Sequence, residues 1–167
     1  MKYLKIIPLT LIMVLLMSMP VCAQAAVQDV EVDVVNTTKH NYSFGEMQAD
    51  LNILAQKYPD YLKVSSVGTS VDGRAIYQAI MGNPNAKHAI FIMGTIHGRE
   101  WMNSWILMEQ LEWCLDNWNS TAPNGETYRN VFNDCCIYLL PMVNPDGVEI
   151  SQNGFDAINN EELRNSL

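Results

Sequence analysis

The chain has 167 residues, of which 49% are hydrophobic, and its 18 acidic and ten basic side chains give a formal net charge of −8 at pH 7. This length allows one domain with a substantial hydrophobic core. The acidic balance, without a cluster of basic residues, argues against nucleic acid or an anionic membrane as a partner.

The N-terminus has the order of a secretory signal peptide. Two lysines precede an apolar stretch, residues 6–19, and small residues follow it around Ala25, which is the positive, apolar, small-x-small order of exported proteins. The apolar stretch is short for a membrane span, and Pro8 interrupts it. We therefore predict a signal peptide over residues 1–25 and a secreted or cell-envelope protein that meets the membrane only during export.

A polar leader and then a capped helix follow. Residues 26–42 are acidic and rich in Asn and Thr, which indicates a leader or an edge strand. Ser43 and Glu46 have the spacing of a capping box, in which each side chain satisfies a backbone N–H of the other residue. Apolar residues recur at helical spacing from Met47 onward until Pro59, so the pattern predicts a helix between them.

Three strands are predicted next. Residues 64–68 and 75–81 alternate in the manner of strands, and Asp72-Gly73 between them is a hairpin turn signal. Residues 88–93 form a short apolar run of the kind found in fully buried strands.

A helix and a fourth strand complete the pattern. Apolar residues at helical spacing from Trp101 to Trp118 predict a helix, and the tryptophans in this stripe are interpreted as core rather than as a carbohydrate-binding platform. A strand over residues 136–143 leads into the turn signal Asn144-Pro145-Asp146-Gly147. The order helix, hairpin, strand, helix, strand indicates an α/β fold with a mixed β-sheet flanked by helices.

Three cysteines remain after the signal peptide, namely Cys114, Cys135 and Cys136. Export would permit a disulfide between Cys114 and one of the adjacent pair, and buried free thiols are the alternative. The chain contains no Cys-x-x-Cys pair, so the pattern indicates neither a thiolate zinc site nor a redox motif.

A candidate metal-binding tetrapeptide, His97-Gly98-Arg99-Glu100, stands between the third strand and the helix that follows it. In open α/β sheets, ligands bind in the crevice beyond the carboxyl ends of the strands. An imidazole and a carboxylate three residues apart suit Zn²⁺, which takes His nitrogen and Glu oxygen as ligands. Because this spacing is common by chance, the tetrapeptide needs the support of its context.

That context is a set of three motifs in one order. The hairpin segment from Ser70 to Gly73-Arg74 comes first, the segment Gly94 to Glu100 second, and Asn144-Pro145-Asp146-Gly147 third. Over about residues 43–150 the chain resembles the zinc carboxypeptidase family, which includes bacterial relatives that trim cell-wall peptides. The resemblance implies a zinc carboxypeptidase-like α/β/α fold and zinc-dependent peptidase activity.

Residue by residue, the resemblance implies that His97 and Glu100 are two zinc ligands. It also implies that Arg99 contacts substrate in an outer subsite, while a solvated or salt-bridged surface arginine is the alternative. The cofactor would be Zn²⁺ and the partner a peptide substrate, with cell-wall peptide as one such substrate. Water activated by the metal would attack a peptide or amide carbonyl.

The sequence departs from the family in one respect. In that family the third zinc ligand and the general-base glutamate lie far downstream, and neither His40 nor His88 matches the missing ligand. We therefore expect residues 43–167 to be the N-terminal part of a longer catalytic domain, with the general base beyond Leu167 and residues 159–165 in an interrupted surface insertion. The isolated chain would be inactive, and a non-catalytic exported binding domain on the same scaffold is the alternative.

Overall fold

The computed structural model describes residues 33–39 and 41–166. The predicted signal peptide and His40 lie outside these residues. In chain order the elements are α2 (Phe44–Lys57), β1 (Leu62–Thr69), β2 (Ala75–Met81), β3 (His88–Met93), the 3₁₀ helix η1 (Gly98–Glu100), α3 (Trp101–Asp116), α4 (Tyr128–Asp134), β4 (Cys135–Leu140), α5 (Pro145–Asn153), the 3₁₀ helix η2 (Phe155–Ala157) and α6 (Glu161–Ser166). None of the helices in this part of the chain is long and apolar enough to span a membrane.

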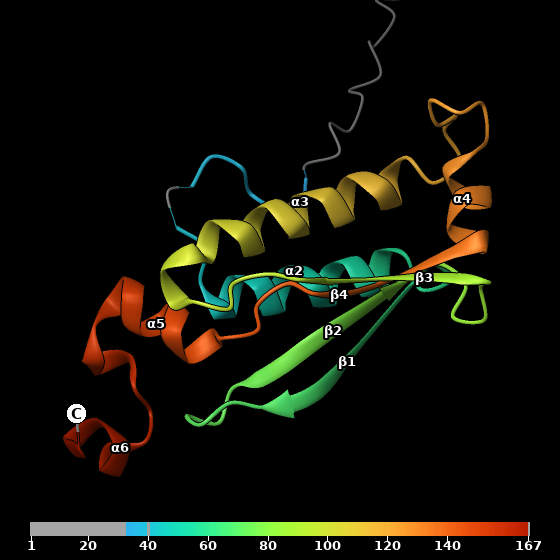
Figure 1. Ribbon diagram of the computed structural model, residues 1–167. Coiled ribbons are helices and arrows are strands. Elements are labelled where there is room, and N and C mark those ends of the chain that lie inside the picture. The colour runs from blue at the N-terminus through green and yellow to red at the C-terminus, as the bar shows by residue number, and fades with distance from the viewer. Residues whose placement is uncertain (1–32, 40, 167) are drawn as a thin grey trace, which may run out of the picture. The chain divides into compact units, whose positions relative to one another are not determined.

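The strands form one mixed sheet in the order β1-β2-β4-β3 (Figure 1). The β1–β2 and β2–β4 pairs are antiparallel, whereas β3 and β4 run parallel. Parallel neighbours need a long crossover connection, which α3 and α4 provide here. The predicted α/β fold, with a mixed sheet flanked by helices, is confirmed, and the three predicted strands up to residue 93 lie close to their predicted positions.

Helix α2 begins where the capping box predicts. The Ser43 hydroxyl accepts from the Glu46 backbone N–H, and the Glu46 carboxylate accepts from the Ser43 N–H at 2.9 Å. Together these bonds satisfy two of the backbone donors that a helix N-terminus leaves without partners. The helix ends at Lys57, just before Pro59, and its apolar face is buried as expected.

The core lies between helices α2 and α3 and one face of the sheet. Buried residues of the strands alternate onto this face, as the two-residue period of a strand requires, and they meet the apolar stripes of the two helices. The buried members are Met47, Leu51, Leu54, Leu62, Ala79, Met81, Met108, Leu111, Leu115, Trp118 and Leu139. The interpretation of the tryptophan-containing stripe as core is confirmed at Trp118, which is buried. Trp101 and Trp105 are half-buried and pack against the core cluster.

The prediction that residues 88–93 form a fully buried strand is wrong in its burial, although its bounds are right. Strand β3 is at the edge of the described sheet and pairs there with β4 alone. Phe91 and Met93 point to the face opposite Ile92 and are 56% and 50% exposed. The apolar run therefore predicted the strand but not the burial of its side chains, because burial depends on elements packed against the strand that a local pattern does not contain.

Part of the predicted leader packs onto helix α3. Residues 33–39 form bends and a turn without a strand, and Val35 is fully buried in the core. The buried carboxylate of Glu112 accepts from the backbone N–H groups of Val34 and Val35, at 2.6 and 2.7 Å. These two charge-assisted bonds fix the segment to α3, which sequence polarity alone did not indicate.

Two predictions for the C-terminal half need correction. The segment Asn144-Pro145-Asp146-Gly147 starts helix α5 instead of forming only a turn, since the Asn144 side chain accepts from the Gly147 N–H and Pro145 occupies the first helical turn. A further helix, α4, precedes β4, whose strand ends at Leu140. Residues 159–165, which the sequence assigns to a surface insertion, are mostly exposed and contain helix α6, whose start is tied to the fold. That they form an insertion stays a prediction.

Cys114, Cys135 and Cys136 are free thiols in this structure. Cys136 is buried on β4, and its Sγ lies 3.5 Å from the carbonyl oxygen of Met81. Of the two states left open by the sequence, the structure has the free thiols.

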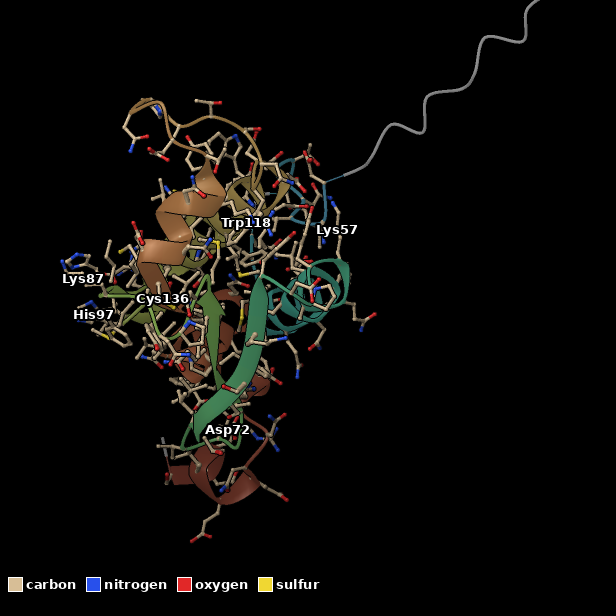
Figure 2. All side chains as sticks on the ribbon, turned by 90° about the vertical axis from the view of Figure 1, so that its right-hand side faces the viewer. Lys57, Asp72, Lys87, His97, Trp118 and Cys136 are labelled. Atoms are coloured by element: carbon tan, nitrogen blue, oxygen red, sulfur yellow. The ribbon has the colours of Figure 1, made fainter. Side chains whose placement is uncertain are left out.

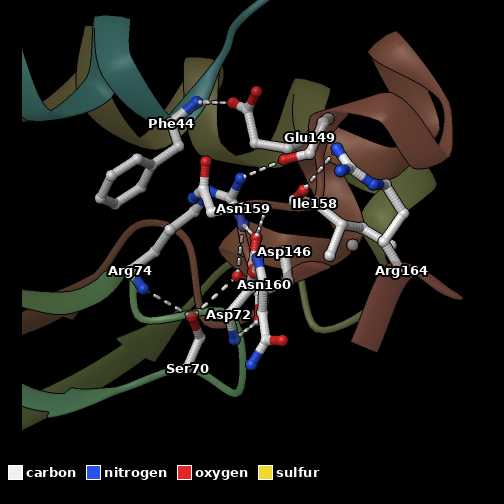
Figure 3. Close-up of polar contacts among 12 residues, drawn as sticks. Phe44, Ser70, Asp72, Arg74, Asp146, Glu149, Ile158, Asn159, Asn160 and Arg164 are labelled. Carbon is white, nitrogen blue, oxygen red and sulfur yellow. Dashed lines mark hydrogen bonds and ion pairs between the residues drawn. The ribbon is translucent and has the colours of Figure 1, made fainter. Parts of the chain in front are cut away.

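A polar cluster joins the β1–β2 turn to α5 (Figure 3). One oxygen of Asp146 accepts from the Ser70 hydroxyl at 2.7 Å and from Arg74 at 2.8 Å, and its other oxygen accepts from the Asp72 backbone N–H at 2.9 Å. The first and third sequence motifs are therefore in direct contact. Because the Arg74 guanidinium is mostly buried, this ion pair is less screened by solvent than a surface pair would be.

Asp72 fixes the C-terminal segment to the same cluster. Its carboxylate pairs with Arg74 and accepts from the backbone N–H groups of Asn159 and Asn160, at 2.8 and 2.7 Å. Burial alone would raise the pKa of the Asp72 carboxyl, but the two backbone hydrogen bonds and Arg74 outweigh it and hold the pKa below its ordinary value.

We expect Asp72→Asn to lower the free energy of unfolding by about 2–3 kcal/mol at pH 7, because it removes the charge that Arg74 and the two amides stabilise. The pKa of Asp72 is lowered in the folded state, so this stabilisation is present above the unfolded pKa of about 3.9 and is lost as pH falls through the folded pKa. Urea unfolding at pH 7 and at about pH 3 should show the difference from the unsubstituted chain shrink with acid.

Asp60→Asn is the matched control, since it removes the same charge from an exposed site. Equal urea midpoints for the two variants at pH 7 would contradict the stabilising role of Asp72.

Candidate metal centre

The candidate ligands come together at the carboxyl end of β3. His97 precedes the 3₁₀ helix η1, whose last residue is Glu100, and the single helical turn brings the two side chains to one side. His97 Nδ1 lies 2.9 Å from Glu100 Oε1, and Glu100 Oε2 lies 3.4 Å from the His97 backbone nitrogen. The side chains are 77% and 45% exposed, and His97 stands at the surface in Figure 2.

The chemistry of this pair fits a zinc ion. The hydrogen bond with His97 holds the pKa of the Glu100 carboxyl below its ordinary value, so Glu100 is an anion at neutral pH. Two ligand atoms each about 2.0–2.2 Å from one Zn²⁺ are separated by roughly 3–3.6 Å. The observed 2.9 Å is close to that span. The structure thus brings the two side chains together, and their role as metal ligands stays a prediction.

Helix α5 braces the turn that carries the pair. The Asn144 side-chain amide donates to the Ile96 carbonyl oxygen at 3.1 Å, and the Ser151 hydroxyl donates to the Gly98 carbonyl oxygen at 2.9 Å. The backbones of Gly98 and Gly147 are in direct contact. A Cβ added to Gly98 would lie 2.1 Å from the Gly147 carbonyl carbon, so a side chain has no room there. The second and third motifs are therefore packed against each other.

Arg99, the third candidate site residue, is exposed. It forms no ion pair with any residue that the structure describes. Its guanidinium is thus available to a ligand from the same turn that carries His97 and Glu100, and a role in substrate binding stays a prediction.

No third His, Cys, Asp or Glu joins His97 and Glu100 within the described ranges. The one group of three potential ligands found there is Asp33, Glu112 and Asp116, and two of the bonds of Glu112 already go to backbone amides. His88 starts β3 and so lies at the opposite end of the strand from His97. The described residues therefore provide two ligands of the three or so that a catalytic zinc site takes from protein.

Comparison with known proteins decides the family. The sequence profile described as zinc carboxypeptidase matches residues 47–166, a segment that contains all three motifs. This chain belongs to the zinc carboxypeptidase family. Membership agrees with the resemblance found in the sequence.

Two curated relatives illustrate the range of this zinc carboxypeptidase family. Gamma-D-glutamyl-L-diamino acid endopeptidase 1 from Lysinibacillus sphaericus is 33% identical over 130 residues, which cover 77% of this chain and 32% of that protein. Carboxypeptidase B from Astacus astacus is 35% identical over 112 residues, which cover 66% of this chain and 34% of that protein. The chain spans about a third of the length of these relatives.

A solved structure supports the fold. The crystal structure of carboxypeptidase A from Helicoverpa armigera superposes with a TM-score of 0.58 at 23% identity, over 71% of this chain and 28% of that chain. At this identity the likeness is one of fold alone.

Sequence reasoning found the pair of candidate ligands but missed the residues that brace them. Asn144 before Pro145 was a readable signal, since Asn is a preferred helix N-cap and Pro a preferred first helical residue. Ser151 carried no such signal, because its contact with Gly98 depends on where α5 packs.

We expect Gly98→Ala to destabilise the fold by at least about 1–3 kcal/mol, the usual cost of overpacking, because the new methyl group would meet rigid backbone at Gly147. Gly45→Ala is the matched control. Gly45 lies in helix α2 with nothing within 4 Å of an added Cβ, so this substitution should stabilise the helix by about 0.5–1 kcal/mol. Thermal unfolding of both variants measures the effects, and equal melting temperatures would contradict the close backbone contact.

Proposed function

We propose that this protein is an exported zinc metallopeptidase that hydrolyses peptide or amide bonds. One observation carries the proposal: an imidazole nitrogen and a carboxylate oxygen lie 2.9 Å apart, on one turn, at the carboxyl end of a strand. The family of the chain supplies the chemistry that this pair would serve.

Each residue of the turn has a proposed part in that chemistry. His97 and Glu100 bind the ion, and the negative charge of Glu100 offsets part of the charge of a divalent cation. Their exposure leaves the solvent side open to water and to substrate. When bound, Zn²⁺ supplies Lewis-acid polarisation of the scissile carbonyl and lowers the pKa of water. Arg99 reaches substrate from the same turn.

We propose further that the third zinc ligand and the general base come from another part of a longer polypeptide. Two observations support this. The chain spans about a third of the length of its curated relatives, and the edge strand β3 exposes Phe91 and Met93 where a core would be expected to continue.

The proposed substrate is a peptide, and cell-wall peptide is our specific proposal. The relative from Lysinibacillus sphaericus is named as a gamma-D-glutamyl-L-diamino acid endopeptidase, which supports this class. Carboxypeptidase B from Astacus astacus supports the trimming of C-terminal residues as the alternative.

We expect the 167-residue chain to show negligible peptidase activity, and a polypeptide extended by roughly another 150 residues, to the size of a full domain, to show zinc-dependent hydrolysis. His97→Ala in the extended protein should abolish that activity, because it removes one ligand of the ion. Release of peptide fragments, measured with and without a chelator, tests this.

His88→Ala is the matched control, since it removes an exposed histidine from the other end of β3. Robust zinc-dependent hydrolysis by the short chain would contradict the proposal that ligands are missing. Peptide binding without hydrolysis by the extended protein would favour a non-catalytic binding domain instead.

Export is a separate proposal with its own test. The order of charged, apolar and small residues before Ala25 supports removal of the first 25 or so residues. N-terminal sequencing of the secreted product should give a start between Gln24 and Gln28. Recovery of the chain in a soluble fraction with Met1 intact would contradict export by this route.

A further inference from the structure

Thr95, two residues before His97, has a backbone conformation that its side chain disfavours. Its φ of 54° lies in the left-handed region, and no other non-glycine residue of the described segments has a positive φ. A β-branched residue in this region is a genuine outlier. Such conformations persist where the surroundings fix them, and they cluster at functional sites.

The backbone around Thr95 is fixed by the end of strand β4. The Gly94 N–H donates to the Leu140 carbonyl at 2.9 Å, and the Gly94 carbonyl accepts from Val143 at 3.1 Å. The Thr95 carbonyl then accepts from the Asn144 N–H at 3.1 Å. These bonds extend the pairing of β3 with β4 beyond the strands themselves, so Thr95 cannot relax its φ without breaking them.

The buried hydroxyl of Thr95 reaches across the turn. Thr95 Oγ1 donates to the carbonyl oxygen of Glu100 at 2.9 Å. Its hydrogen is then used, so the Ser104 hydroxyl, 2.6 Å away, donates to Oγ1, as does the Ser104 backbone N–H at 3.2 Å. Thr95 and Ser104 are almost completely buried. The hydroxyl is fully satisfied and joins the turn to the first turns of α3.

We infer that Thr95 is a positioning residue for the zinc site. Its hydroxyl fixes the backbone of Glu100, and its left-handed backbone sets the direction in which the chain enters His97. The side chains of His97 and Glu100 are then oriented before the ion binds, so the binding of the ion does not have to order the turn. This inference rests on the proposed zinc-binding role of His97 and Glu100, and Thr95 itself does not contact the ion.

The alternative is that Thr95 only stabilises the fold, and three substitutions separate the two roles. Thr95→Val keeps the shape of the side chain and removes the hydroxyl. Thr95→Ser keeps the hydroxyl and removes the methyl group. Thr95→Gly removes the hydroxyl but favours the positive φ, so this variant should fold even if Thr95→Val does not.

The measurement is a titration of the extended polypeptide with Zn²⁺ alone, because the third ligand is proposed to lie outside the 167 residues. Binding is followed by the NMR signals of the His97 imidazole. His88 gives an internal control for adventitious binding at an exposed histidine. Loss of an outer contact to a metal ligand typically weakens metal binding by about 10–100-fold. We therefore expect Thr95→Val and Thr95→Gly to weaken zinc binding at His97 by about tenfold or more, and Thr95→Ser to bind as the unsubstituted chain does.

Thermal unfolding of the same samples separates zinc binding from fold stability. Thr95→Gly should melt at or above the temperature of Thr95→Val, whereas both variants should bind zinc weakly. Unchanged zinc binding at His97 in folded Thr95→Gly would overturn the inference about Thr95 and leave the proposed metal site standing. Weak binding by Thr95→Ser, equal to that of Thr95→Val, would also overturn it, since the hydroxyl would then not be the group that acts. If zinc leaves His97 unperturbed in the unsubstituted extended polypeptide, the proposed metal site fails, and the inference fails with it.

Discussion

The bonds accepted by the Asp146 carboxylate hold together the parts of the structure that lie far apart in the sequence. They join α5 to the β1–β2 turn through Ser70, the Asp72 backbone and Arg74. Helix α5 in turn packs against the turn that carries His97 and Glu100. The Asp146 carboxylate thus fixes helix α5, which supports the candidate metal centre. Asp146 itself lies neither in strand β3 nor in the turn that carries His97 and Glu100.

The elements of the fold were predictable where a local signal decides them. The bonds between Ser43 and Glu46 set the start of α2, and Asp72-Gly73 set the hairpin, because caps and turns depend on residues close in sequence. The burial of β3 was not predictable, because an edge strand and a central strand have the same apolar pattern. The start of helix α5 is not decided by its local sequence, because Asn144-Pro145 is a turn signal and the same two residues also suit a helix N-terminus.

The candidate site likewise has features that local sequence decides and features that tertiary packing decides. The approach of His97 to Glu100 follows from their spacing on a single turn, and the sequence predicted it. The contacts of Thr95 did not follow from any local pattern. A threonine is not expected at a φ of 54°, and its partners come from the helix after the turn and the strand exit that packs beside it. Candidate ligands are therefore readable from sequence, whereas the residues that support them depend on tertiary packing.

The position of β4 has a consequence for the order in which the chain can fold. This strand lies between β2 and β3, both of which precede it in the sequence. The β1–β2 hairpin can form locally, but β3 has no partner in the described sheet until the chain has passed through residues 94–134 and reached β4. Non-local pairing of this kind slows folding, because the entropy of closing the long loop is lost before the contacts form. During synthesis, the apolar side chains of β3 are thus exposed from the time they emerge until Leu140 follows, and α5 can brace the turn only after that.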